Sequence, residues 1–338
     1  MDYTEKKLVS SEQINSPSVE YFCRKVLVIN NWKVITRMKR FFANMIPLLI
    51  GVSLSAVLAT VDWFGFWFIF APIGASVSLG FFINERIGIR DKDFGRKISI
   101  SLVALILLIF LGIMQHENLQ LEETVFYFSY FIYTGLFARV LIHYAIAKVF
   151  GPLIWGRGFC GWGCWTAAVL EWLPIKENNK IPKKYTYIRI PVFIISILIP
   201  FLFIRSGYDY VNKHIYRPSY GFDDLPFQLH KFDQFVWFLV GNAIYYIVAI
   251  VLAFTFKKKR AFCKICCPVS LVMKAQTKIA LLKTKPSGVK CIECGKCNKE
   301  CPMDVNVMGY ISAKKAILSS ECISCGVCRR VCPVQAIK

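Results

Sequence analysis

Six apolar runs, each about the length of a membrane-spanning helix, constrain the fold of this chain more than any other feature. A helix needs about 20 residues to cross the apolar part of a bilayer. Runs of this kind lie near residues 41–60, 63–84, 98–115, 125–147, 188–205 and 234–256. Because 56% of the 338 residues are hydrophobic and only 19% are charged, the composition is also more apolar than that of a typical soluble domain. We therefore predict an α-helical integral membrane protein with about six transmembrane helices.

The basic residues between these runs predict the topology. The chain has a formal net charge of +21, and Lys and Arg collect in loops that stay in the cytoplasm. Such residues crowd the arm at 1–40, the loop at 85–97 and the stretch after the last run, whereas TVDW at 60–63 and QHENLQLEE at 115–123 contain none. We therefore predict a multi-pass protein of the cytoplasmic (inner) membrane, with both termini on the cytoplasmic side. The loops without basic residues and the long loop at 206–233 would lie on the other side, and no nucleic-acid partner is needed to explain the charge.

The last fifth of the chain contains the pattern C-x-x-C-x-x-C-x-x-x-C-P twice, in CIECGKCNKECP and in CISCGVCRRVCP. This spacing is typical of bacterial-type ferredoxin domains with two [4Fe-4S] clusters, in which the fourth cysteine of each run ligates the other cluster. It predicts one cluster on Cys291, Cys294, Cys297 and Cys332, and a second on Cys322, Cys325, Cys328 and Cys301. The alternative of two structural zinc sites explains the C-x-x-C pairs but gives the fourth cysteine and the proline no role.

Two further cysteine pairs lie next to the predicted membrane. Cys160 and Cys164 in FCGWGCW have the same spacing as Cys263 and Cys267 in FCKICCP, and an aromatic residue precedes each pair. On a helix the two thiols of a pair share one face, so the two pairs together supply four thiolates for a third iron-sulfur cluster. Buried cysteines also pack as small apolar side chains, and thiolates bind copper or act as a redox dithiol. We favour the third cluster and leave these alternatives open.

These motifs divide the chain into four predicted parts. A cytoplasmic N-terminal arm covers 1–40, and a membrane domain that contains the first cysteine pair covers 41–256. A cytoplasmic connector covers 257–289 and contains the second pair within a CxxxCP motif at 263–268. The ferredoxin domain with two [4Fe-4S] clusters covers 290–338.

The combined pattern resembles the NapH, NosR and CcoG group of membrane-bound polyferredoxins, which share C-x-x-x-C-P motifs. The resemblance rests on the membrane spans, on CGWGC, on CKICCP and on the two-cluster motif, and it covers the chain from about residue 40 onward. Trp165 stands where the first family motif usually has proline. The chain is similar to minimal members, without the flavin domain of NosR-like proteins or the extra C-terminal domain of CcoG-like ones. The resemblance implies electron transfer, with quinol as donor in NapH-like members and copper reduction during oxidase assembly in CcoG-like members.

An electron-transfer protein needs one site for its donor and another for its acceptor. Residues 257–338 carry 17 Lys and Arg against four Asp and Glu, so we expect an exposed ferredoxin domain that binds an acidic redox partner or anionic lipid. Arg139 and His143 share a helical face in the predicted fourth span. Ionisable groups in a membrane mark functional sites because they are costly to bury, which makes this pair the candidate quinone site. The alternative is that Arg139 extends to the interface and His143 makes an ordinary interhelical hydrogen bond.

The sequence as a whole predicts a membrane-bound iron-sulfur protein that is linked to quinol or quinone and relays electrons through its ferredoxin domain to or from a partner. The alternative function is a copper reductase or assembly factor for a respiratory metalloenzyme, as the CcoG resemblance implies. The predicted cofactors are two [4Fe-4S] clusters, with a third cluster and quinone left open. Haem is disfavoured because the chain has four histidines and no C-x-x-C-H motif.

Overall fold

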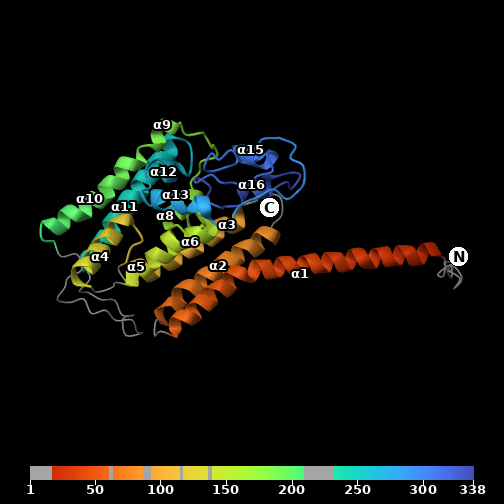
Figure 1. The fold of residues 1–338 in the computed structure, drawn as a ribbon, viewed down its shortest axis with the longest axis horizontal. Coiled ribbons are helices and arrows are strands. Elements are labelled where there is room, and N and C mark those ends of the chain that lie inside the picture. The colour runs from red at the N-terminus through yellow and green to blue at the C-terminus, as the bar shows by residue number, and fades with distance from the viewer. Residues whose placement is uncertain (1–16, 61–63, 87–92, 115–116, 136–138, 209–231) are drawn as a thin grey trace, which may run out of the picture. The chain divides into compact units, whose positions relative to one another are not determined.

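The computed structural model describes residues 17–60, 64–86, 93–114, 117–135, 139–208 and 232–338, and Figure 1 shows its helices in chain order. It divides into two units, Met1–Ile46 and Pro47–Lys338. Within the described residues the regular structure is helical, and β pairing is limited to an isolated antiparallel bridge between Pro286 and Ile337. The predicted helical fold class is confirmed.

Five helical segments among the described residues are long and apolar enough to cross a membrane. They cover Met38–Ala59, Phe64–Arg86, Phe94–Met114, Lys183–Arg205 and Gln234–Thr255. The elements that form them are α1 (Pro17–Ala59), η2 (Phe64–Phe66), α2 (Trp67–Arg86), α3 (Phe94–Leu107), the π-helix η3 (Leu108–Met114), α9 (Lys183–Thr186), α10 (Arg189–Arg205) and α11 (Phe232–Thr255). These segments correspond to five of the six predicted apolar runs.

The predicted span at 125–147 is wrong as a single helix. Helix α4 (Leu121–Thr134) ends at Gly135, which has φ +71° and donates its N–H to the carbonyl of Phe131 at 2.8 Å. Glycine adopts this left-handed conformation without steric cost, and the conformation ends an α-helix. A shorter apolar helix follows at Val140–Trp155. Its elements are α5 (Arg139–Tyr144), the π-helix η4 (Ala145–Phe150) and α6 (Gly151–Trp155).

The polar stretch before α4 is buried, although the sequence indicates an external loop there. Residues 117–120 have no regular structure, yet Glu117, Asn118 and Gln120 are each at most 6% exposed. Their polar groups find partners inside the protein, since Gln120 Nε2 donates to Asn242 Oδ1 of α11 at 3.4 Å. Buried polar groups normally require such partners. A polar segment therefore enters the helical domain between α3 and α4, and the side of the membrane on which it lies stays a prediction.

Small residues allow α2 and α3 to pack closely. A side-chain carbon added at Gly80 would lie 2.7 Å from the carbonyl oxygen of Gly95, and one at Gly95 would lie 2.3 Å from the carbonyl oxygen of Gly80. Ser99 of α3 is fully buried on the same side, 2.6 Å from the added carbon at Gly80. Close backbone approach at small residues is the usual basis of helix packing in membranes. This contact fixes the start of α3, which carries the buried Arg96.

The C-terminal region folds against the helical domain within the second unit. Its elements are α12 (Ala261–Ile265), α13 (Val269–Ile279), α14 (Lys296–Lys299), α15 (Val307–Ser312) and α16 (Val327–Val331). Figure 1 shows α15 and α16 next to α13 and to the beginning of α3. One apolar cluster includes Ile100 of α3, Met273 of α13 and Ile323 and Ile337 of the C-terminal segment. Cys160 and Cys263 belong to this shared core, as do Cys297, Cys301 and Cys325 of the C-terminal domain.

Candidate functional site

The first predicted set of ferredoxin cysteines surrounds one cavity. Cys291, Cys294, Cys297 and Cys332 line one pocket, together with apolar side chains such as Met308. Cys332 comes from the second cysteine motif and the other three come from the first. Cys297 is buried, whereas Cys294 is exposed. The fold therefore brings together the crossed set that the spacing predicts and leaves one edge of it at the surface.

The second predicted set surrounds another cavity. Cys301, Cys322, Cys325 and Cys328 line a second pocket, and again one cysteine, here Cys301, comes from the other motif. The remaining wall is apolar and includes Met303, Val305, Val307, Ile317, Ile323 and Val327. Within the described chain, no three His, Cys, Asp or Glu side chains converge on a point that a single metal ion could occupy. Cysteines arranged around a cavity suit a polynuclear cluster better than a single zinc ion.

The two cysteine motifs fold as a local repeat. Gly295 and Gly326 have φ values of +70° and +72° and precede the short helices α14 and α16. The amide of Val305 donates to Cys301 Sγ at 3.3 Å. The amide of Ala336 donates to Cys332 Sγ at the same distance. Cys301 and Cys332, the fourth cysteines of the two motifs, therefore each accept a hydrogen bond from a backbone amide. Amide donors to sulfur stabilise the thiolate and tune the potential of a cluster.

The cysteine pairs at 160–164 and 263–267 share one turn geometry. Cys160 lies in the one-turn helix α7 (Gly158–Trp162) and Cys263 lies in α12. After each helix the amide of the second cysteine donates at 3.0 Å to the carbonyl of the aromatic residue before the first, which joins Cys164 to Phe159 and Cys267 to Phe262. Two segments about 100 residues apart in sequence therefore fold into matching turns.

The structure brings these two pairs together. The Cys267 thiol lies within electrostatic range of Cys263, Cys160 and Cys164. Burial raises the pKa of the Cys263 thiol to about 11, because the effect of burial and of the neighbouring thiolates exceeds the opposite effect of Arg260. Cys160 and Cys263 are buried, and Cys164 and Cys267 are half-buried. Thiols ionise when a metal centre binds, because the metal supplies the compensating positive charge. Cys266, which interrupts the second motif, packs with Phe262 and Cys267 in one apolar cluster and with Ile265 in another, outside the cluster that contains Cys160 and Cys263.

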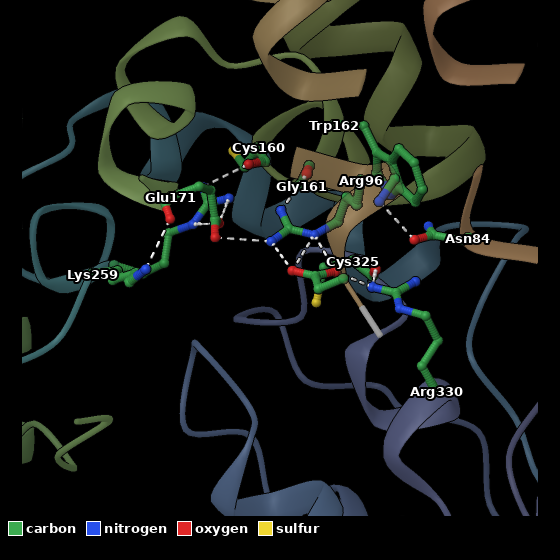
Figure 2. Close-up of polar contacts among 12 residues, drawn as sticks. Asn84, Arg96, Cys160, Gly161, Trp162, Glu171, Lys259, Cys325 and Arg330 are labelled. Carbon is green, nitrogen blue, oxygen red and sulfur yellow. Dashed lines mark hydrogen bonds and ion pairs between the residues drawn. The ribbon is translucent and has the colours of Figure 1, made fainter. Parts of the chain in front are cut away.

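The turn around Cys160 contacts the ferredoxin-like domain directly. Gly161 follows Cys160, and a side-chain carbon there would lie 2.3 Å from the carbonyl oxygen of Ile323 and 3.5 Å from the Cα of Cys325. Trp162 Nε1 donates to the carbonyl of Ser324 at 3.1 Å. Figure 2 shows Cys160, Gly161 and Trp162 on one side and Cys325 on the other. The CGWGC turn therefore lies against the backbone of the second cysteine set.

Two arginines hold this turn through its carbonyl groups. Arg260 Nη1 donates to the carbonyl of Cys160 at 2.8 Å, and Arg96 Nη1 donates to the carbonyl of Gly161 at 3.0 Å. Both guanidinium groups also bind Glu171, which ends α8 (Trp165–Glu171). Burial opposes ionisation of this carboxyl, but the charges of Arg260 and Arg96 outweigh it and lower the pKa of Glu171 to about 2. Figure 2 shows Glu171 and Arg96 in this network, which Asp93 extends to Arg330 of the ferredoxin-like domain.

Two acidic residues of the ferredoxin-like domain bind buried cations. Glu321 pairs with Arg157 at 2.9 Å and with Arg189 at 3.2 Å, and these charges lower the pKa of its carboxyl to about 2 in spite of burial, which raises it. Asp304 pairs with Lys258 at 2.8 Å and with Lys264 at 2.6 Å. The domain is therefore held by ion pairs along one face. The sequence-based expectation of an exposed domain applies to its other face, where Cys294 is exposed.

The two residues of the predicted quinone site differ in what the structure describes. His143 is 5% exposed, and its Nδ1 lies 3.2 Å from Glu117 Oε2. Helix α5 begins at Arg139, but the side chain of Arg139 lies outside the described residues. Glu117 was not predicted as a site residue, because it lies in a stretch predicted to be an external loop. Arg96, Arg157 and Glu171 were not predicted either. Each is a charged residue close to a cysteine motif or to an apolar run, and that position in the sequence could have identified them.

Two family models match parts of the chain. A 4Fe-4S dicluster domain matches residues 283–333, and a 4Fe-4S binding domain matches residues 140–182 and 240–285. The second match covers both pairs of cysteines outside the ferredoxin-like domain. No curated protein and no solved structure matches the chain. The chain is thus an iron-sulfur protein with helices suited to a membrane, and the finer resemblance to the NapH, NosR and CcoG group stays a prediction.

Proposed function

We propose that this protein is a membrane-bound electron-transfer subunit that carries electrons between quinone in the membrane and a redox partner. The observation that supports it best is the contact of Gly161 with the Ile323–Cys325 backbone. This contact joins the turn that carries Cys160 to the loop that carries Cys325. Electron transfer between one-electron sites requires that neighbouring sites lie close together. The three cysteine sets would therefore form an electron-transfer path from the apolar helices to the exposed domain.

We assign three clusters to the three sets of four cysteines. The proposed ligands are Cys160, Cys164, Cys263 and Cys267 for the membrane-proximal cluster, Cys301, Cys322, Cys325 and Cys328 for the middle cluster, and Cys291, Cys294, Cys297 and Cys332 for the outer cluster. The residues fit these groups, because each set offers four sulfur donors, and the middle and outer sets each line one pocket together with apolar side chains. When bound, [4Fe-4S] clusters accept and release single electrons at potentials set by hydrogen bonds, charge and solvent exposure.

The protein's cations are placed to stabilise negative charge along this path. Arg157 is fully buried and lies within electrostatic range of Cys160, Cys263 and Cys267. Cys322 of the middle set also lies within range of Arg157. A buried guanidinium between two sets favours the reduced, more negative form of each. Arg157 therefore supports electron transfer between the membrane-proximal and middle sets.

The outer set is the proposed exit to a partner. Cys294 is exposed, and Ile292 nearby in the chain is 58% exposed. The charged residues of this stretch are exposed too, three of them basic and two acidic: Lys290, Lys296, Lys299, Glu293 and Glu300. An apolar contact among charged side chains suits the docking of a redox protein. Since basic residues mark the cytoplasmic side, we place this face and both termini in the cytoplasm.

One experiment tests the function. The full chain is purified without oxygen in lipid nanodiscs, its clusters are reduced with dithionite, and the reduced protein is mixed separately with a short-chain quinone and with Cu(II). The proposal expects rapid reoxidation by the quinone. Reoxidation by Cu(II) alone would contradict it and would favour the copper-reductase alternative.

A further inference from the structure

Buried acidic and aromatic side chains gather near the membrane-proximal cysteine set, between α4, α5, α10 and α11. Glu117 and His143 form one pair, with 3.2 Å between Oε2 and Nδ1, and both are about 5% exposed. The ring of Phe66 lies 4.7 Å from the His143 ring, measured between centroids. A carboxylate that binds Nδ1–H holds the imidazole in the tautomer whose Nε2 can accept a proton.

A second carboxyl group lies in the middle of the spans. Glu122 Oε1 accepts a hydrogen bond from Ser196 Oγ at 2.6 Å, and both of its oxygens lie 3.1 Å from the hydroxyl of Tyr245. Ser196 and Tyr245 belong to the interiors of α10 and α11, which are both long enough to cross a membrane. An ionisable group at this depth is costly and is retained where it has a function.

Polar atoms near these carboxyl groups lack a protein partner. Nε2 of His143 and the hydroxyl groups of Tyr144 and Tyr246 are buried without a hydrogen bond from any described residue. Tyr144 is 6% exposed and lies within electrostatic range of both Glu122 and Cys267. Tyr246 lies within range of Cys164. Buried polar atoms are normally paired, so these atoms indicate a ligand that arrives between the carboxyl groups and the cysteines.

We propose that Glu117, His143, Glu122 and Tyr144 form the binding and proton-accepting site for a hydroquinone. This inference rests on the proposed function and names the site at which electrons enter. Oxidation of one hydroquinone to quinone breaks two O–H bonds and releases two protons and two electrons. His143 Nε2 accepts one proton and the Glu122 carboxylate accepts the other. When bound, the iron-sulfur cluster assigned to Cys160, Cys164, Cys263 and Cys267 would accept the two electrons one at a time.

The chemistry of the group favours a hydroquinone over other donors. It offers two proton acceptors, His143 Nε2 and the Glu122 carboxylate, and an aromatic ring at Phe66. These groups suit a donor that releases two protons together with its electrons. The site shares His143 with the sequence-based candidate and adds Glu117 and Glu122, whereas the side chain of Arg139 lies outside the described residues.

The test uses the full chain in nanodiscs and separates binding from structure. In His143→Asn the new amide nitrogen replaces Nδ1 as donor to Glu117, so the variant loses Nε2 alone. Tyr144→Phe and Glu122→Gln are the companion variants, and Tyr130→Phe is the matched control because Tyr130 is buried in a different apolar cluster. The measurements are the Kd of a hydroxyquinoline N-oxide, which is a hydroquinone analogue, and the rate at which a short-chain hydroquinone reduces the clusters.

We expect His143→Asn to raise the Kd roughly tenfold or more, because a hydrogen bond to a polar ligand atom is lost. Reduction by hydroquinone should slow in all three variants, while iron content and the dithionite-reduced signals stay unchanged and Tyr130→Phe behaves as wild type. Wild-type Kd and rate in His143→Asn and Glu122→Gln, with normal binding by the unaltered protein, would overturn this site and leave the proposed function standing. Failure of the unaltered protein to bind the analogue or to be reduced by hydroquinone would overturn both.

Discussion

Arg260 Nη1 donates a hydrogen bond to the carbonyl oxygen of Cys160 at 2.8 Å. The same guanidinium binds Glu171, whose other oxygen lies 3.0 Å from Arg96 Nη2. Arg96 in turn donates to the carbonyl of Gly161. One carboxylate therefore organises two arginines that hold consecutive carbonyl groups beside a proposed cluster ligand.

The ion pairs of Glu171 should make the protein less stable in acid. Burial raises the pKa of this carboxyl, but Arg260 and Arg96 lower it to a net value of about 2, whereas a glutamate in an unfolded chain has a pKa of about 4.3. The stabilisation is therefore present above about pH 4.3 and is lost as the pH falls toward 2, and it is on the order of 3 kcal/mol.

Thermal unfolding of Glu171→Gln and of the unaltered protein between pH 7 and pH 3 measures this effect. The variant should have the lower Tm at pH 7, because the buried Arg260 loses the carboxylate that it binds and the buried Arg96 keeps only Asp93. The gap between the two proteins should narrow below about pH 4.3. A constant gap over the whole range would show that the charge of Glu171 is not the cause. Iron content at each pH identifies samples that have lost their clusters.

Enlarging Gly161 should separate the turn of Cys160 from the ferredoxin-like domain. A side-chain carbon at this position would lie 2.3 Å from the carbonyl oxygen of Ile323, so Gly161→Val must displace the backbone. We expect a lower Tm and slower electron transfer between the membrane-proximal and middle clusters after flash reduction. Gly65→Ala is the control, because nothing lies within 4 Å of the added carbon at Gly65. Equal transfer rates in the two variants would mean that this contact is not part of the path.

Two adjacent lysines allow a matched comparison of ion pairs. Lys258 is fully buried and binds Asp304 at 2.8 Å, whereas Lys257 and Glu177 are 61% and 52% exposed at 3.1 Å. Asp304→Asn leaves a buried ammonium without a counter-charge and should cost about 3–5 kcal/mol. Glu177→Gln should change the free energy of unfolding by less than about 1 kcal/mol. Denaturant titration followed by limited proteolysis of the C-terminal domain measures both, and similar losses in the two variants would contradict the burial argument.

The two distant cysteine pairs should behave as ligands of one centre. Cys160→Ser and Cys263→Ser should each remove the same paramagnetic signal from the reduced protein and leave the signals of the ferredoxin-like domain in place. Cys266→Ser is the control, because Cys266 lies outside the apolar cluster that contains Cys160 and Cys263. Loss of different signals in the two variants would refute a shared cluster.

Much of the fold was accessible from sequence because hydrophobic length and cysteine spacing are local signals. Five of the six predicted runs correspond to helices long enough to span a membrane. The prediction of one helix over 125–147 was wrong because hydropathy carries no information about backbone conformation, and the left-handed φ of Gly135 ends helix α4. The buried position of Glu117 was also out of reach, since its partner His143 is 26 residues away. A polar segment is buried only where the folded protein provides hydrogen-bond partners for it, and those partners cannot be identified from a single sequence.

The face by which the ferredoxin-like domain packs on the helices could not be predicted either, because its contacts also join residues far apart in sequence. A net count of Lys and Arg indicated an exposed basic domain, but Glu321 and Asp304 each bind two or more buried or half-buried cations. Those pairs join residues that lie far apart in sequence. The crossed cysteine sets were predictable in spite of their separation, because the ligand spacing of a two-cluster ferredoxin encodes the crossing.

The iron and acid-labile sulfide content of the anaerobically purified chain tests the central claim most directly. Three [4Fe-4S] clusters predict about twelve iron and twelve sulfide per chain, falling to about eight of each when Cys160 and Cys263 are both replaced by serine. About eight of each in the unaltered protein, with no change on replacing these cysteines, would contradict the third cluster and with it the proposed path from the membrane.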